Sequence, residues 1–305
     1  MIMLKKGNMI SNVVVSSILG HSGRGMFPLT LKLSYRKFVK KVLETKTTVI
    51  AESATRFKIV GNYQIRKPWT WWIYVRKLPR MSLLNAFGLT NDGIEKCAKK
   101  ILRSAKKGFQ VIPSYFPEFS KGLDIAIKEA LEAIAIYQSE LGDYFFALEI
   151  NVSCPNAGED VSKNMSQAVA CAKAIKARHP DLTLIVKLSY LHPISLAEEL
   201  ERVGVNIIHG INTIPYGEVF PNKQSPLHKV GGGGISGGLA YPQALEYNTK
   251  LSKRVSIPLI MGCGITDLIS LGEYKDIRGN GNSVSICSLV RLNPTKAIMA
   301  IEISN

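Results

Sequence analysis

Short apolar runs alternate with amphipathic stretches along most of this chain of 305 residues. A short apolar run bounded by turn residues is typical of a buried strand, whereas apolar positions repeated every three or four residues predict a helix. The pattern predicts strands over residues 13–18, 47–51, 109–113, 146–152, 183–188, 205–211, 257–261 and 283–287. It predicts helices over residues 34–44, 91–106, 122–141, 162–178, 195–203, 241–253 and 294–303.

Eight predicted strands, most of them followed by a helix, favour one architecture. Strands that alternate with helices form parallel sheets, and eight such units close into a (β/α)8 barrel, the TIM barrel. Neither a linker nor a repeat divides the chain. We therefore expect a single α/β barrel domain over residues 1–305, with a glycine-rich loop at 231–238 after the sixth strand.

Composition narrows the class of protein further. The chain has five cysteines and no Cys-x-x-Cys pair, which argues against a disulfide framework, a zinc ribbon or an iron–sulfur cluster, so we expect no metal site. The sequence lacks an apolar stretch long enough for a membrane span, and the N-terminus lacks the apolar core of a signal peptide. We expect a cytoplasmic protein.

The positive charge is concentrated in one part of the sequence. Residues 30–110 contain 19 Lys and Arg against four acids, which is +15 of the total net charge of +16. Such a field favours anionic partners. We find no nucleic-acid recognition module beside it and expect no nucleic acid as partner. The charge indicates a solvated basic face, or one that steers an anionic substrate.

Residues 56–80 form an excursion from the barrel pattern. All three tryptophans lie within residues 66–77, between basic residues. One interpretation is a hairpin whose tryptophans pack over the barrel rim. The alternative is a surface for lipid headgroups, a nucleic acid or a protein partner.

Polar residues gather where the predicted strand 146–152 ends. The apolar run passes through Asn151 toward Cys154, Pro155 and Asn156. Pro155 cannot donate to a sheet ladder, so the strand gives way to a loop there. In a parallel barrel this end of the strand lies on the catalytic face. Cys154 is therefore either a reactive thiol or an inert small apolar residue.

The next two predicted strands end in a similar way. Lys187 closes an otherwise apolar strand, where a lysine needs an anionic or strongly accepting partner unless it reaches out to solvent. Asn212 and Thr213 follow the sixth strand. Side-chain amides at one barrel mouth suit the donors and acceptors of a uracil-like ring. The four amides expected to converge are those of Asn85, Asn151, Asn156 and Asn212.

Three turns rich in glycine or small residues follow consecutive predicted strands, at residues 231–238, 262–265 and 287–288. Barrel enzymes often bind phosphate with the loops after strands seven and eight. Glycines let backbone N–H groups approach the phosphate oxygens. The turns therefore predict a phosphorylated cofactor.

Together these motifs resemble the dihydroorotate dehydrogenase family, specifically its soluble class with a cysteine base. Their order along the chain is specific, whereas no single glycine motif is. The matching segments are LNAFGL (84–89), LEINVSCPN (148–156), VKLS (186–189), INTI (211–214), GGISGG (233–238) and, less closely, MGCGI (261–265).

The resemblance implies FMN as the cofactor and oxidation of dihydroorotate to orotate in pyrimidine biosynthesis. Cys154 would be the base that removes the proton from C5 while hydride passes from C6 to flavin N5. Lys187 would face the N1–O2 edge of the flavin, and Asn151 would bridge both ligands. The implied substrate-binding residues are Asn85, Phe87, Gly88, Leu89, Asn151, Asn156, Asn212 and Thr213. The implied FMN-binding residues are Ser17, Ser53, Asn151, Lys187, Ile211, Gly237, Cys263, Gly264, Cys287 and Ser288.

The resemblance also implies a homodimer. It leaves the electron acceptor open between fumarate, a quinone and a separate iron–sulfur flavoprotein subunit.

One departure from the family pattern keeps other functions open. Glu52 stands where the family usually has a lysine beside the flavin. Two charges about 4 Å apart interact by about 4 kcal/mol at an effective dielectric of about 20, so this reversal bears on an anionic substrate. A second hypothesis is an FMN-dependent oxidoreductase acting on another dihydropyrimidine or an enoate. A third, non-enzymatic hypothesis is a basic barrel that binds RNA or an anionic membrane through residues 66–77.

Overall fold

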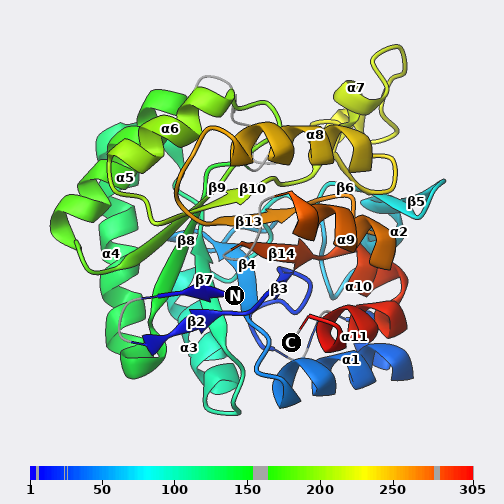
Figure 1. Ribbon diagram of the computed structural model, residues 1–305, viewed down its shortest axis with the longest axis horizontal. Coiled ribbons are helices and arrows are strands. Elements are labelled where there is room, and N and C mark those ends of the chain that lie inside the picture. Colours follow the sequence, from blue (N-terminus) through cyan, green and yellow to red (C-terminus); the bar gives the residue numbers. More distant parts are fainter. Residues whose placement is uncertain (5–6, 24, 26, 154–163, 278–281, 305) are drawn as a thin grey trace.

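The computed structural model describes residues 1–4, 7–23, 25, 27–153, 164–277 and 282–304, and eight parallel strands form a closed barrel at its centre (Figure 1). The predicted (β/α)8 fold is confirmed. Around the barrel each strand lies beside its neighbour in the sequence, in the order β10-β13-β14-β3-β4-β7-β8-β9. These strands are β3 (Val13–Ser16), β4 (Val49–Ala54), β7 (Val111–Tyr115), β8 (Ala147–Asn151), β9 (Thr183–Lys187), β10 (Ile207–Gly210), β13 (Leu259–Gly262) and β14 (Ser283–Ile286).

Helices surround the barrel and bury one face each against it (Figure 1). In α3 (Ile94–Ala105), for example, Cys97 and Ile101 are buried while Lys99 and Arg103 are exposed. The other long helices are α1 (Leu33–Glu44), α4 (Leu123–Leu141), α5 (Met165–Arg178), α6 (Ile194–Arg202), α8 (Tyr241–Ser252), α9 (Leu268–Asp276) and α11 (Pro294–Glu302). The short helices are α2 (Thr70–Ile73), α7 (Tyr216–Val219) and α10 (Ser288–Leu292), with 3-10 turns at Leu29–Leu31, Phe119–Lys121, Gly142–Tyr144 and His228–Val230.

Aliphatic side chains fill the barrel near the amino ends of its strands. An antiparallel hairpin of β1 (Ile2–Met3) and β2 (Met9–Ile10) packs Ile2 and Ile10 against them. In barrel enzymes this end serves stability rather than chemistry. The barrel residues of this buried layer are Val14, Ile50, Ile112, Ala147, Ile185, Ile207 and Ile260, and we call it the floor.

A second, antiparallel sheet was not predicted. Its strands are β5 (Val75–Leu78), β6 (Ser82–Asn85), β11 (Ile214–Pro215) and β12 (Gly234–Gly237), in the order β11-β12-β6-β5. The expected loop at 231–238 therefore contains a strand. Its glycines allow close pairing with β6, because a Cβ atom at Gly237 would lie 2.2 Å from the carbonyl oxygen of Met81.

The tryptophan-rich excursion has features of both interpretations, packed tryptophan and exposed tryptophan. It does contain a hairpin, β5–β6, and Trp71 packs edge-on against Phe27 with ring centroids 4.7 Å apart. Trp69 and Trp72 instead remain 59% and 68% exposed. No helix in the described part of the chain is long and apolar enough to cross a bilayer.

Candidate active site

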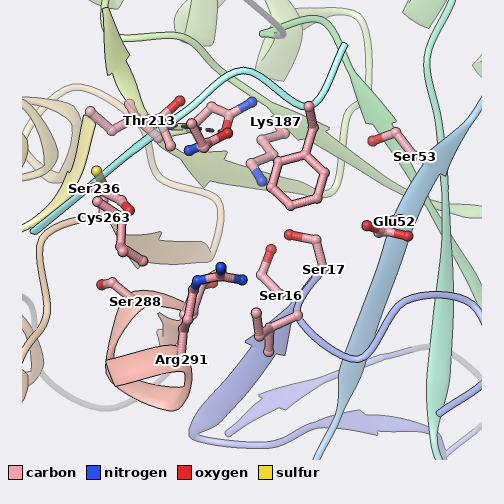
Figure 2. A pocket seen from close by; sticks show the side chains of 18 of the residues that line it. Ser16, Ser17, Glu52, Ser53, Lys187, Thr213, Ser236, Cys263, Ser288 and Arg291 are labelled. Carbon is pink, nitrogen blue, oxygen red and sulfur yellow. Dashed lines mark hydrogen bonds between the residues drawn. The ribbon is translucent and has the colours of Figure 1, made fainter. Parts of the chain in front are cut away.

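A pocket opens at the carboxyl ends of the barrel strands, away from the floor. Its wall continues onto the second sheet through Asn85 of β6 and Ser236 of β12. The space inside it, mouth included, is about 1270 Å³. Figure 2 shows polar side chains from several strands pointing into it. A concave site with a few convergent polar groups is the usual form of a small-molecule site.

Lys187 is a buried cation in this pocket. The strand register places it between Asn151 of β8 and His209 of β10. Only 8% of its surface is exposed, so it does not reach out to solvent. Within the described ranges, no carboxylate forms an ion pair with its ammonium group. Since an unpaired buried charge is costly, the site favours an anionic or strongly accepting ligand.

A chain of hydrogen bonds connects two of the four predicted amides, those of Asn151 and Asn212. Asn212 Nδ2 donates to Ser153 Oγ at 3.1 Å, and Ser153 Oγ donates to Asn151 Oδ1 at 2.6 Å. Asn151 Nδ2 in turn donates to Ser53 Oγ at 2.8 Å. Each amide thus has at least one of its atoms hydrogen-bonded within the protein, and this bond fixes the orientation of the amide group.

The same chain ends on a buried carboxylate. Ser114 Oγ donates its only hydrogen to Glu149 Oε1 at 2.8 Å. Ser53 Oγ lies 2.9 Å from Ser114 Oγ, and it must be the donor of that bond because the hydrogen of Ser114 is already used. His209 Nδ1 lies 2.6 Å from Glu149 Oε2. Burial opposes ionisation of Glu149, but His209, Lys187 and Ser114 together hold the pKa of its carboxyl below the ordinary value. Every donor in the chain therefore points toward an ionised group.

Glu52 is a second acid of the pocket, and its surroundings favour the neutral form. It lies on β4 and lines the pocket (Figure 2). Burial raises the pKa of its carboxyl to about 7, an effect that Lys100 only partly offsets. Near neutral pH Glu52 therefore keeps its proton far more readily than an exposed glutamate does. Because a protonated Glu52 is uncharged, it repels an anionic substrate less than the sequence led us to expect.

Arg291 brings a second cation to the pocket. It lies on α10, one turn after Ser288, and Figure 2 shows Lys187 and Arg291 both pointing into the pocket. Burial lowers the pKa of its guanidinium. No carboxylate in the described part of the chain pairs with it. A guanidinium in this position suits a phosphate or carboxylate group of a ligand.

Two thiols complete the wall near Arg291. Burial raises the pKa of Cys263 to about 12 and also raises that of Cys287. Neutral thiols line a pocket as small apolar groups and are poor nucleophiles. Among the described residues, no cluster of three His, Cys, Asp or Glu side chains could hold a metal ion.

Comparison with known proteins identifies the family. The family model for dihydroorotate dehydrogenase matches residues 71–267, which include all of β5 to β13 and the turn after β13. The chain belongs to the dihydroorotate dehydrogenase family.

Curated relatives within the dihydroorotate dehydrogenase family are similar over much of the chain. The catalytic subunit of dihydroorotate dehydrogenase B (NAD(+)) from Porphyromonas gingivalis is 29% identical over 208 residues, covering 64% of this chain and 64% of the relative. The subunit of the same name from Brachyspira hyodysenteriae is 28% identical over 228 residues, covering 73% and 71%. That from Oceanobacillus iheyensis is 28% identical over 232 residues, covering 74% and 70%.

Most of the residues implied by the resemblance to dihydroorotate dehydrogenases meet in the pocket. Asn151 does not line the pocket itself but donates a hydrogen bond to Ser53, which does. Gly237 and Gly264 are not among the lining residues, although Ser236, Cys263 and Ile265 beside them are. Cys154 and Asn156 lie outside the described residues. The expected residues that line the pocket are Ser17, Ser53, Asn85, Phe87, Gly88, Leu89, Lys187, Ile211, Asn212, Thr213, Cys263, Cys287 and Ser288.

Three groups in or beside this dehydrogenase-family pocket were not predicted from the sequence: His209 and Arg291 line it, and Glu149 is buried next to it. His209 interrupts the apolar run of β10 as Lys187 interrupts β9, a signal that could have been read. Glu149 likewise stands inside an apolar strand. Arg291 gives only a weak signal, its spacing of one helical turn from Ser288.

Proposed function

We propose that this protein is an FMN-dependent oxidoreductase that oxidises dihydroorotate to orotate. The observation that carries the proposal is the convergence of Lys187 with the amides of Asn85 and Asn212 in one pocket at the barrel mouth. The names of the curated relatives, catalytic subunits of dihydroorotate dehydrogenase B, support the same reaction.

The pocket residues fit FMN. Lys187 is buried and Arg291 half-buried, both point into the pocket, and neither forms an ion pair with a carboxylate in the described part of the chain. FMN has two groups that suit these cations: a phosphate, and a ring that gains negative charge on reduction. Lys187 would hold the ring, and Ser288 and Arg291 the phosphate end. When bound, FMN supplies the acceptor for the hydride that leaves the substrate.

The amides fit a pyrimidine substrate. A pyrimidine ring presents N–H donors and carbonyl acceptors along its edges, and side-chain amides pair with both. The hydrogen-bond chain from Asn212 to Glu149 holds the amides of Asn151 and Asn212 in a fixed orientation before any ligand arrives. A preorganised site spares the cost of ordering these groups during binding.

Cys154 is our proposed general base, which takes the proton from C5 of the dihydropyrimidine. Its role rests on the motif, in which it directly follows Ser153 of the hydrogen-bond chain. A thiol acts as a base only after losing its proton, and a positive field lowers its pKa. Lys187 and Arg291 supply such a field in the pocket. Asn156 is proposed as a further substrate ligand on the same motif.

The partners of the reaction are also proposals. The relatives are named as catalytic subunits, which supports a separate electron-acceptor subunit for this chain as well. We further propose a homodimer, on the resemblance alone, and a location in the cytoplasm.

The decisive experiment is anaerobic mixing of the flavin-loaded protein with dihydroorotate. We expect bleaching of the flavin absorbance and formation of an equal amount of orotate. Because Glu52 lines the pocket, dihydrouracil and a panel of enoates form the second arm. Bleaching by dihydrouracil but not by dihydroorotate would assign the other substrate class. A flavin that no member of the panel reduces or reoxidises would overturn both assignments.

A further inference from the structure

A second cavity adjoins the pocket. Glu52, Phe87 and Thr90 line both of them. The second cavity lies between residues 20–22, residues 58–66 and the outer face of α3, and the space inside it, mouth included, is about 2140 Å³. A ligand there would lie beside the ligand of the first pocket without replacing it.

The charge of this second cavity is strongly positive. Of its two acids, Asp92 is already paired with Lys100, and Glu52 favours its neutral form. A concave surface with one sign of charge concentrates ions of the opposite sign. Among the described residues, six basic side chains line it, those of Lys58, Arg66, Lys100, Arg103, Lys106 and Lys107.

A buried imidazole provides an independent sign of a ligand. His21 lines the same cavity and is only 7% exposed, yet neither of its ring nitrogens has a hydrogen-bond partner among the described residues. Buried polar groups are nearly always hydrogen-bonded, so an unpartnered imidazole calls for an explanation. Burial and Lys100 lower the pKa of His21 to about 4, so the ring is neutral and has one N–H to donate.

We propose that the second cavity binds a multiply charged phosphate ester or diphosphate, held by the basic face of α3 and by His21. Arg103 lies in the last turn of α3 and Lys107 in the turn that follows it, and both line the cavity, so they can share one ligand. A singly charged anion would leave most of the lining cations uncompensated, whereas a diphosphate would neutralise several of them. This site does not depend on the proposed oxidoreductase function.

The test is calorimetric titration of the flavin-loaded full chain with inorganic pyrophosphate, with inorganic phosphate and chloride in parallel. We expect one saturable site that prefers pyrophosphate and weakens as salt is added. Arg103→Ala and Lys107→Ala should each weaken pyrophosphate binding about tenfold, the loss expected for one charge-assisted hydrogen bond. Lys253→Ala, which removes an exposed lysine beyond the end of α8, is the matched control and should change binding less than about twofold.

Variants of His21 distinguish a specific pyrophosphate site from non-specific attraction to the positive charge of the cavity. His21→Ala should weaken pyrophosphate binding about tenfold, whereas His21→Asn, which keeps an N–H donor, should retain most of it. The imidazole NMR signals of His21 should move on addition of pyrophosphate in the wild type. These signals report on the ring directly, so they remain decisive if His21→Ala fails to fold.

Three results would overturn the site. Equal weakening by Lys253→Ala and Arg103→Ala would show a general effect of net charge. Release of FMN in proportion to added pyrophosphate would place the anion in the first pocket. Lack of saturable binding at low salt would remove the site altogether. Flavin content and reduction by dihydroorotate are measured on the same samples, so a failure of the proposed function is seen separately.

Discussion

The floor and the mouth of the barrel are built from the same strands and differ in the side chains that these strands point inward. On β8, Ala147 belongs to the aliphatic floor, whereas Glu149 and Asn151 belong to the polar hydrogen-bond chain. On β9, Ile185 belongs to the floor and Lys187 lines the pocket. Alternate residues of a strand face the same side, so a step of two residues changes the interior from apolar to polar.

This difference teaches how the barrel separates stability from chemistry. The floor gains free energy from buried aliphatic area, and its packing is sealed by Ile2 and Ile10 of the N-terminal hairpin. The mouth is less stable by itself, because it holds the buried charge of Lys187 and the half-buried charge of Arg291, which a ligand would compensate. Loss of a ligand-binding group at the mouth should therefore alter function, and loss of aliphatic packing at the floor should alter stability.

The largest effect is expected at the mouth, from Cys154→Ala. Loss of a general base costs about 10²–10⁴-fold in rate, so turnover of dihydroorotate should fall by that factor while bound flavin remains. Steady-state assays and the flavin absorbance check the two parts. Cys171→Ala is the matched control, because Cys171 is a buried thiol in α5, away from the pocket lining. Normal turnover of Cys154→Ala would remove Cys154 from the mechanism.

The corresponding change at the floor is Ile112→Ala. Ile112 is fully buried among the aliphatic side chains of the floor. Truncating a buried isoleucine costs about 2–5 kcal/mol through lost burial and a residual cavity. Urea unfolding should show this loss in the free energy of unfolding, while flavin binding by the folded protein stays unchanged. A variant that kept its stability but lost flavin would contradict the division between floor and mouth.

Glu52 should make the stability of the flavin-free protein depend on pH. In the folded protein its pKa is raised to about 7 from an ordinary value of 4.5, so between these pH values the folded state holds more protons than the unfolded state. Stability is then fully present below about pH 4.5 and falls by at most about 3 kcal/mol as the pH rises through 7.

Glu52→Gln cannot ionise and should lack this loss of stability. Urea unfolding at a series of pH values measures the difference between Glu52→Gln and the wild type. Glu218→Gln, at an exposed residue of α7, is the control. If the free energy of unfolding changed with pH in the same way for the wild type and Glu52→Gln, the pKa of Glu52 would not be raised in the folded state.

The smallest of these effects concerns Arg291. If its guanidinium holds the phosphate of FMN, Arg291→Ala should weaken FMN binding about tenfold to a hundredfold and leave riboflavin binding nearly unchanged. Arg291→Lys should fall between the two, because an ammonium lacks the bidentate geometry of a guanidinium. Fluorescence titration with both flavins gives the comparison. An equal loss for FMN and riboflavin would place Arg291 against the ring instead.

Sequence periodicity was sufficient to predict the barrel, because each of its strands is an apolar run of ordinary length followed by a turn. It did not predict α9, which begins at a reciprocal pair of side-chain contacts. Asp267 Oδ1 accepts from the backbone N–H of Ser270 at 2.9 Å, and Ser270 Oγ accepts from the backbone N–H of Asp267 at 3.2 Å. Nor did it predict the sheet of β5, β6, β11 and β12. That sheet joins segments far apart in the chain, and β12 is so rich in glycine that it reads as a loop.

The candidate site was predicted in outline from residues at strand ends, such as Lys187 and Asn212. What the sequence could not reveal is which distant residues meet. Ser53, Ser114 and Glu149 form one hydrogen-bond chain although they lie on three strands, and their register appears only in the folded barrel.

The most direct test of the central claim is the absorbance spectrum of the purified protein, followed by titration with orotate. A mouth built as described predicts about one FMN per chain after reconstitution and a saturable shift of the flavin spectrum on adding orotate. A preparation that is colourless and does not take up added FMN would contradict the account.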